Sequence, residues 1–285
     1  MFPWTMKGKL NKLFSVLNRN QIEIDILSET LDISSCSSKI GGMPSCPRNF
    51  VWPTYKITKK GETKNLPLAF LAQFNLKEIS KYDTEGLLPK TGILSFFYEL
   101  EEMKWGFSPE DKGCARVFYF EDENNLVTCA FPQELPKDFQ IPELALKFKS
   151  KKSLPAWEEY DLYDNSVQYE SEFYDEIKAK KLGAEESDFK ILGYADVIQD
   201  AMPMDCELVN RGFDLGNGPA KITDQEKSEV NKACKDWILL FQMGSITTDD
   251  YELMFGDCGK IYFYIRKDDL ASNNFDNIWL VLQCF

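Results

Sequence analysis

The sequence predicts an α+β fold built mainly from antiparallel sheet. Its 285 residues are 44% hydrophobic and 14% aromatic, which is typical of a folded globular protein and favours strands. Two distant stretches, GILSFFY at 92–98 and GKIYFYI at 259–265, both begin with glycine followed by β-branched, aliphatic and aromatic residues. This similarity predicts an internal duplication that gives two pseudo-symmetric sheet lobes, with an N-terminal helix and a connecting helix.

The phrases that precede these strands extend the duplication. LPLAFLAQFNL comes before the first and DWILLFQMG before the second, and aligning them places Gln73 with Gln242. Aligning the two leading glycines pairs Phe96 with Phe263. Each copy is thus a strand that ends near a glutamine, a turn, a glycine-led strand and a third strand. Because two copies are too few for a solenoid, we expect two similar sheets packed about a pseudo-twofold axis.

Ahead of the first of these strands, the sequence predicts a helix, a strand and a long loop. Leucine and phenylalanine recur with helical spacing between residues 10 and 17, which favours an amphipathic helix over 1–20. Isoleucines at 22, 24 and 26 alternate with acidic residues, as in a half-buried strand. Glycines and prolines interrupt 38–53, so we expect a long loop there that carries Trp52. Ordered loops of this length often carry function.

A strongly acidic stretch separates the two lobes. Residues 157–176 hold eight carboxylates and no basic residue, with aromatic residues at roughly helical separations. We expect a helix whose acidic face is either solvated or a docking surface for a basic partner. The predicted organisation is a single domain over 1–285, made of the N-terminal helix (1–20), the first lobe (21–150), the acidic helical connector (151–186) and the second lobe (187–285).

Charge and absent residue types exclude several functions. The net charge of −13 repels phosphate backbones and anionic lipid, so we expect neither nucleic acid nor membrane as a partner. The chain has no histidine, which excludes Ser-His-Asp hydrolysis and histidine-bearing zinc sites. No phosphate-binding glycine motif and no EF-hand spacing occurs, so we expect no cofactor and no metal.

Cysteine usage indicates the compartment. The eight cysteines are scattered and form no C-x-x-C pair, which is typical of reduced, buried thiols. No signal-peptide pattern and no apolar run of membrane-spanning length is present, so we expect a cytoplasmic protein.

Two glutamines and a tryptophan are candidates for a binding site. Gln73 and Gln242 each interrupt an apolar strand, and an unpaired buried carboxamide costs about 1–3 kcal/mol. Each must therefore bond either to nearby loop backbone or to a polar ligand in a shared cleft. Trp52 in its loop either caps the edge of a core or anchors a partner.

Three further polar residues accompany glycines at expected turns or strand ends. They are Asp196 with Gln199, and Asp257 within FGDCG. An aspartate beside a glycine commonly closes a turn. Two carboxylates that faced one another could instead share acid and base roles if burial separated their pKa values.

Seven phrases, in order along the chain, resemble the YwqG-like bacterial proteins, a domain of unknown function. They are SKIGGMPSCPRNFVWP, PLAFLAQFNL, GILSFF, LGYADVIQ, DWILLFQM, FGDCGKIYFYI and IWLVLQC, which together span roughly Ser38 to Cys284. The resemblance implies an α+β fold, largely sheet, with internal pseudo-symmetry, in a cytoplasmic bacterial protein. The chain has Ala195 where such proteins usually have a proline, and it lacks the histidines found in many relatives. Genes of this kind sometimes lie near toxin and immunity genes, which implies an antitoxin-like alternative.

The sequence therefore favours a non-catalytic binding module that uses a groove between the two duplicated sheets. Its partner would be a basic protein, a toxin among them, or a small polar ligand. The alternative is a carboxylate-dependent hydrolase or transferase that uses Asp196 and Asp257. The predicted groove residues are Trp52, Gln73, Asp196, Gln199, Gln242 and Asp257.

Overall fold

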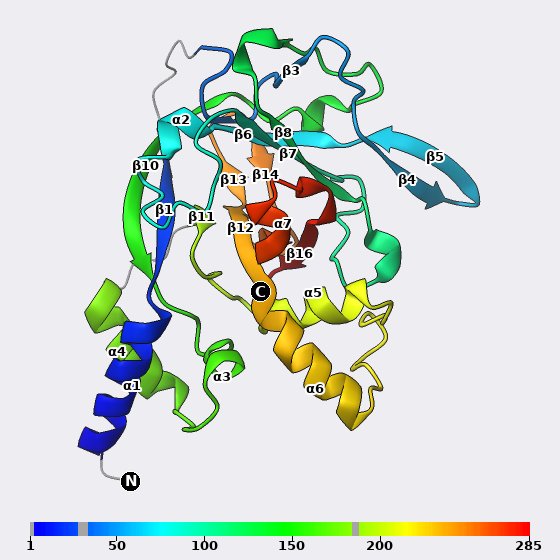
Figure 1. Ribbon diagram of the computed structural model, residues 1–285. Coiled ribbons are helices and arrows are strands. Elements are labelled where there is room, and N and C mark those ends of the chain that lie inside the picture. Colours follow the sequence, from blue (N-terminus) through cyan, green and yellow to red (C-terminus); the bar gives the residue numbers. More distant parts are fainter. Residues whose placement is uncertain (1–2, 28–33, 184–187) are drawn as a thin grey trace.

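The fold is organised by one antiparallel sheet that contains strands from the whole length of the chain. The computed structural model describes residues 3–27, 34–183 and 188–285 (Figure 1). Its main sheet has ten strands, which confirms the predicted α+β class with a mainly antiparallel sheet. From one edge to the other they are β16 (Trp279–Gln283), β15 (Lys260–Arg266), β12 (Trp237–Gly244), β11 (Phe189–Leu192), β1 (Arg19–Ile26), β10 (Leu144–Ser153), β2 (Lys39–Ile40), β6 (Ala69–Asn75), β7 (Ile93–Tyr98) and β8 (Ala115–Phe120).

The strand order is symmetric about the centre of the sheet when the strands of each half of the chain are numbered separately. In each half, the third, fourth and fifth strands follow one another outward to a sheet edge: β6, β7 and β8 on one side, β12, β15 and β16 on the other. The first strands, β1 and β10, pair with each other at the centre, and each also pairs with the second strand of the opposite half. The two expected lobes are therefore halves of a single continuous sheet with exchanged first strands.

Backbone register shows that the duplication extends to individual residues. Gln73 lies opposite Lys39 on β2, and Gln242 lies opposite Lys190 on β11. The ladder shifts at one residue in each half, between Phe70 and Ala72 in β6 and between Leu239 and Phe241 in β12. Such a bulge turns two successive residues to the same face.

The faces of the central strands follow from alternation. Ile22 and Ile24 point into the main core, which defines the inner face, while Glu23 and Asp25 lie on the outer face. Strand β10 places lysines opposite these acids, and the ion pairs Lys151–Glu23 (2.6 Å) and Lys149–Asp25 (2.6 Å) form across the strands. Opposite charges on paired strands stabilise this register.

The seam between the halves is solid core, so the predicted groove between the duplicated sheets is wrong. The sheet curves until the inner faces of the two halves meet, and the ring centroids of Phe96 and Phe263 lie 5.1 Å apart. Phe241 lies 5.0 Å from Phe74 and 4.8 Å from Phe96. Aromatic rings pack into the space because both halves present large apolar residues there. The cavity that does lie between the 85–87 loop and β12 measures about 140 Å³ and contains none of the predicted groove residues.

Helices and short strands cover the outer faces and the base of the sheet. The N-terminal helix packs beside the connector, where the rings of Phe14 and Tyr174 lie 5.0 Å apart (Figure 1). In the described residues no helix has the length and apolar character needed to cross a membrane. The remaining elements are α1 (Pro3–Leu17), β3 (Ser45–Pro47) paired with β9 (Leu126–Thr128), β4 (Thr54–Lys59) paired with β5 (Glu62–Pro67), α2 (Leu76–Ile79), α3 (Tyr160–Tyr163), α4 (Ser171–Leu182), α5 (Met202–Asn210), α6 (Asp224–Ala233), β13 (Ile246–Thr247) paired with β14 (Glu252–Leu253), and α7 (Lys267–Ala271).

The acidic connector departs from the single helix predicted over 157–176. It contains the short helix α3 and the longer helix α4, with a non-helical break at 164–170. At the break the Asp164 carboxylate accepts a hydrogen bond from the Ser166 backbone N–H (2.9 Å), a turn that competes with helix. The ends of the predicted segments at 1–2 and 184–186 lie outside the described residues.

The outer face of each half is covered by an insertion at the equivalent point of the repeat, between its second and third strands. In the first half the insertion contains the β4–β5 hairpin, which extends away from the body at the right of Figure 1. In the second half it contains α5 and α6. These covers differ completely although the strands beneath them correspond.

Candidate functional site

Gln73 lies on the outer face beneath the loop that follows β1, and every polar atom of its side chain is paired. Its Oε1 accepts a hydrogen bond from the Ser45 backbone N–H (2.9 Å), and its Nε2 donates to the carbonyls of Ser35 (2.7 Å) and Ser37 (2.9 Å). The side chain is fully buried. Gln73 therefore fastens this loop to the sheet.

Gln242 fastens the equivalent loop in the second half. Its side-chain amide donates to the carboxylate of the Lys190–Asp196 ion pair instead of to loop carbonyls. Its Oε1 accepts from the Asp196 backbone N–H (2.9 Å) and its Nε2 donates to the Asp196 carboxylate (3.0 Å). The Lys190 ammonium lies 2.6 Å from the same carboxylate. Burial would raise the pKa of Asp196, but the Lys190 charge and these hydrogen bonds hold that pKa below its usual range. The Asp196 carboxylate is thus ionised and engaged by the protein itself.

Asp257 lies in an exposed turn. Its neighbours Gly256 (φ 59°) and Cys258 (φ 50°) both have left-handed backbone, and its carbonyl accepts a hydrogen bond from the Phe285 N–H (3.1 Å). No hydrogen bond joins Asp257 to Asp196 in the part of the chain that the structure describes. The geometry therefore gives no support to acid–base catalysis by this pair.

A large polar cavity opens on the first half, between the β4–β5 hairpin and the 99–113 segment that joins β7 to β8. We call it the hairpin cavity; its volume is about 1060 Å³. Trp52 lines it, and is the predicted groove residue that the structure places there. The other lining residues are Val51, Pro53, Thr54, Tyr55, Lys56, Thr58, Asn65, Glu102, Lys104, Ser108, Glu110, Asp111, Lys112, Gly113, Arg116 and Phe118.

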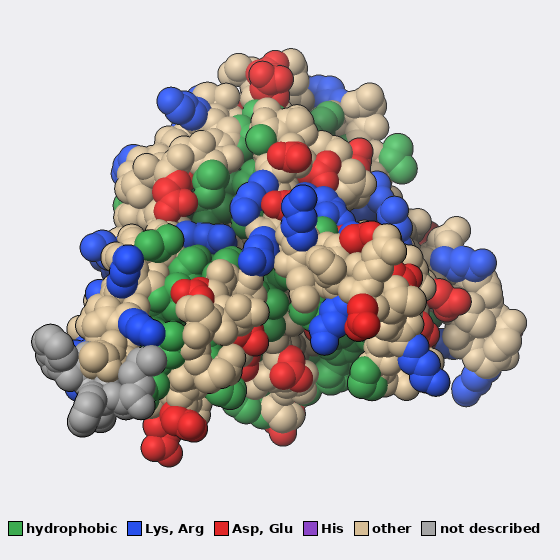
Figure 2. All heavy atoms as spheres, turned by 60° about the horizontal axis from the view of Figure 1, so that its bottom comes forward, with side chains coloured by type: hydrophobic (Ala, Val, Ile, Leu, Met, Phe, Trp, Pro, Cys, Tyr) green, Lys and Arg blue, Asp and Glu red, His purple; other side chains and the backbone are tan. Residues whose placement is uncertain are grey.

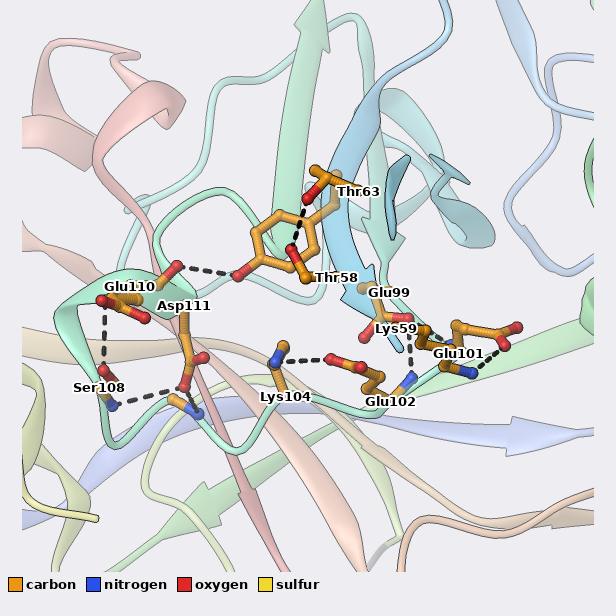
Figure 3. A network of polar contacts seen from close by, with 12 residues as sticks. Thr58, Lys59, Thr63, Glu99, Glu101, Glu102, Lys104, Ser108, Glu110 and Asp111 are labelled. Atoms are coloured by element: carbon orange, nitrogen blue, oxygen red, sulfur yellow. Dashed lines mark hydrogen bonds and ion pairs between the residues drawn. The ribbon is translucent and has the colours of Figure 1, made fainter. Parts of the chain in front are cut away.

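Glu99 lies beside this cavity, directly after the end of β7, and is not one of its lining residues. Its Oε1 accepts hydrogen bonds from the backbone N–H groups of Glu101 and Glu102 (2.9 Å for Glu102). Its Oε2 is buried and has no hydrogen-bond partner among the described residues. Figure 3 shows the Glu99 carboxylate close to the Glu102–Lys104 ion pair (2.7 Å). Burial, reinforced by the Glu102 charge, raises the pKa of Glu99.

Asp111 lies on the other side of Lys104 in Figure 3 and shapes the wall of the cavity. Its carboxylate accepts hydrogen bonds from the backbone N–H groups of Gly106 (3.0 Å) and Ser108 (3.4 Å). Burial raises the pKa of Asp111, and the charge of Asp214 adds to the effect. Lys104 thus forms an ion pair with Glu102, and the charges of Asp111 and Glu99 also act on its ammonium.

Aromatic side chains complete and stiffen the cavity. The Tyr55 hydroxyl donates to the carbonyl of Glu110 (2.8 Å), which ties the hairpin to the opposite wall. The Trp52 indole N–H donates to the Leu68 carbonyl (2.9 Å), and its ring packs edge-on against Phe97 at 5.4 Å. The cavity is therefore held open by fixed hydrogen bonds and packing, and Trp52 both caps a core edge and lines the opening.

The charged residues in and beside this cavity were missed by sequence reasoning. Their signal was present: ELEE at 99–102 puts three glutamates directly after an aromatic strand. An acidic run of this kind is usually a solvated surface, and nothing local in the sequence shows that Glu99 is buried while Glu102 is exposed.

Gln199, the last of the predicted residues, borders a second cavity, beside α5. Its side-chain amide donates to the Cys284 carbonyl (2.9 Å), and the Gln283 Oε1 accepts from the backbone N–H groups of Ile198 (3.0 Å) and Gln199 (3.1 Å). The predicted residues are thus divided among five places in the molecule.

Comparison with known proteins identifies a family for this chain. Within the described residues no group of three or more Cys, Asp or Glu is arranged to hold a metal ion. No curated protein matches the sequence. A family described as a domain of unknown function, DUF1963, matches residues 38–284, which include nine strands of the main sheet and both insertions. On that match the chain belongs to the DUF1963 family.

Proposed function

We propose that this chain is a non-catalytic binding module of the YwqG-like type, and that its hairpin cavity receives a guanidinium or ammonium group from a basic protein partner. The observation that carries the proposal is the pair of carboxylates of Glu102 and Asp111 in the cavity lining. Beside them, bonded to the Glu102 backbone, lies the buried Glu99 carboxylate, whose Oε2 has no partner among the described residues. A buried acceptor without a partner costs free energy, and a cationic donor that reached it would remove that cost.

The other charges of the cavity fit the same occupant. Glu102 forms an ion pair with Lys104, and Asp111 lies on the other side of this lysine, whereas Lys56, Lys112 and Arg116 are exposed elsewhere in the lining. A cationic group can therefore approach Glu102 and Asp111, while acidic groups of the same partner meet the exposed lysines and arginine. This arrangement favours a protein segment that carries both charges.

The aromatic wall favours arginine over lysine. Trp52 and Tyr55 both line the cavity, and a planar guanidinium stacks on aromatic faces while it forms paired hydrogen bonds with carboxylates. Tyr55 is already fixed by its bond to Glu110, so little side-chain freedom is lost on binding.

Recognition of the partner would depend on the local carboxylates of the hairpin cavity and not on a uniformly acidic surface. Figure 2 shows acidic and basic side chains interspersed over one face of the molecule, with Lys and Arg gathered across its middle. The eight free thiols support a reducing compartment such as the cytoplasm as the place where this partner is met.

The experiment is a titration of the isotopically labelled protein with N-acetyl-arginine amide, followed by amide chemical shifts in NMR. We expect saturable shifts at Gly106, Ser108 and Asp111, and none with N-acetyl-glutamate amide. Glu99→Gln keeps the side-chain shape and removes the charge, so it should weaken binding about tenfold, as expected for loss of one charged hydrogen bond.

The matched control is Glu134→Gln, which removes the same charge from an exposed position outside the cavity. It should leave the affinity within twofold. If both variants weakened binding equally, or if the shifts did not saturate, N-acetyl-arginine amide would be responding only to the net charge of the protein, and the proposal would be wrong.

A further inference from the structure

A second cavity, which we call the helix cavity, lies on the outer side of the second half and measures about 700 Å³. It is bounded by the 199–200 loop, α5, the 215–222 loop, the start of α6 and the end of β16. Its lining is largely apolar on one side, a common property of small-molecule sites of this size. The apolar lining residues are Phe107, Met204, Leu208, Leu215, Pro219, Ala220 and Ile222.

Two carboxylates interrupt this apolar lining. Asp205 on α5 and Asp200 in the preceding loop both line the cavity. The Asp205 carboxylate is only partly exposed and has no hydrogen-bond or ion-pair partner in the described part of the chain. Burial and the charge of Asp200 together raise the pKa of Asp205 to about 7. The remaining charged side chains that line the cavity are Asp224 and Lys227 at the start of α6, both exposed.

The loop that carries Asp200 is held in place by β16. The Gln283 amide donates to the Asp200 carbonyl (2.7 Å), while its Oε1 accepts from the two preceding backbone N–H groups. The Gln283 carboxamide is thereby engaged at both its oxygen and its nitrogen. Asp200 and Asp205 offer their carboxylates to a ligand on the α5 side of the cavity.

We propose that the helix cavity binds a small amphipathic amine, with its apolar body against α5 and the 215–222 loop and its ammonium between Asp200 and Asp205. The volume exceeds that of one protein side chain and suits a small molecule. The two carboxylates provide charge complementarity to the ammonium, and the apolar lining residues provide a surface for the rest of the molecule. The site is distinct from the hairpin cavity, because Phe107 faces the helix cavity whereas Ser108 and Asp111 line the other.

Calorimetric titration of the full chain with 2-phenylethylammonium tests this directly, with 2-phenylethanol and 3-phenylpropionate as neutral and anionic arms of similar shape. We expect the amine to bind at least tenfold more tightly than the alcohol, and the anion not to bind. Asp205→Asn should weaken the amine at least tenfold, whereas Asp250→Asn, an exposed position outside the cavity, should leave it within twofold.

The pH dependence gives an independent readout. Because protonation removes the Asp205 charge, amine affinity should rise between pH 6 and pH 8 in the wild type and stay flat in Asp205→Asn. Ala220→Trp, which fills the cavity without changing charge, should abolish binding while the melting temperature stays near that of the wild type. Equal affinity for alcohol and amine, or unchanged affinity in Asp205→Asn, would overturn the proposal.

Discussion

The two halves of the sheet share a framework and differ in what covers it. In both, a glutamine on the third strand lies opposite a buried lysine on the second strand and accepts a hydrogen bond from the backbone six residues after that lysine, at Ser45 in the first half and Asp196 in the second. Over this framework the first half carries a β hairpin and the second carries two helices.

This difference separates the shared framework from the two places where we propose that binding occurs. The equivalent glutamines are buried and satisfied, and the seam is packed, so the shared residues hold the molecule together. The two large cavities instead lie beneath the insertions that the halves do not share. We therefore expect substitutions in the framework to change stability in both halves, and substitutions in the covers to change binding.

The largest effect is expected at the seam. Phe96→Ala and Phe263→Ala remove equivalent rings that touch each other across the pseudo-twofold axis, and each should lower the free energy of unfolding by about 3–5 kcal/mol. Urea denaturation measures both. If one variant cost less than about 1 kcal/mol, the two halves would not depend equally on the seam.

The next largest effect is expected at the two buried lysines, and its size should differ between the halves. Lys190→Met leaves the buried Asp196 carboxylate without its cation and should cost about 3–5 kcal/mol. The matched control is Lys39→Met, because Lys39 is equally buried but its partner Glu143 has a side chain that is 42% exposed. Water can solvate Glu143 after the change, so the cost should be about 0–1 kcal/mol.

The pH dependence of that pair has a defined sign. Since the folded pKa of Asp196 lies below its unfolded value, its stabilising contribution is present above about pH 4 and is lost as pH falls through the folded pKa. The stability gap between wild type and Lys190→Met should therefore narrow in acid. A gap that stayed constant down to pH 2 would contradict the ionised pair.

The smallest effect concerns the carboxyls beneath the two covers. The folded pKa values of Glu99 and Asp205 are raised. Below about pH 4 both carboxyls are protonated in the folded and the unfolded chain, so they do not change the free energy of unfolding. As pH rises through the folded pKa, each carboxyl must ionise in its buried position, which destabilises the fold. Glu99→Gln and Asp205→Asn should thus match the wild type at pH 4 and melt about 2–4 °C higher at pH 8, as expected for roughly 1 kcal/mol in a chain of this size. A melting temperature lowered equally at both pH values would show instead that the charged forms stabilise the fold.

Much of the framework could be predicted because its signal is local. Alternation around Ile22 and the phrases around Gln73 and Gln242 gave the strands, the duplication and the need to satisfy two buried amides. The exchange of first strands could not be seen, because β1 and β10 pair across more than a hundred residues and β10, rich in lysine, shows weak apolar alternation.

The site residues were harder to predict, because their surroundings depend on contacts with residues that are distant in the sequence. Glutamines that interrupt apolar strands look alike whether they bind a ligand or a loop, and only the fold shows that Gln73 and Gln242 face away from the seam. Glu99 and Asp205 carry no local mark, since their burial depends on the hairpin and on α5, which are distant or unpredicted elements. Trp52, which lines the hairpin cavity, was singled out because a tryptophan in a long loop is unusual in itself.

Truncating the hairpin tests most directly whether binding lies in the covers. Tyr55 pairs with Leu66 across the hairpin, so replacing residues 56–65 with Asn-Gly closes a two-residue turn and leaves the strands beneath intact. We predict that this variant keeps a melting temperature within a few degrees of the wild type, loses the arginine-amide shifts at Gly106 and Asp111, and retains amine binding in the helix cavity. Arginine-amide binding of unchanged affinity in the truncated protein would contradict the assignment of function to the insertion.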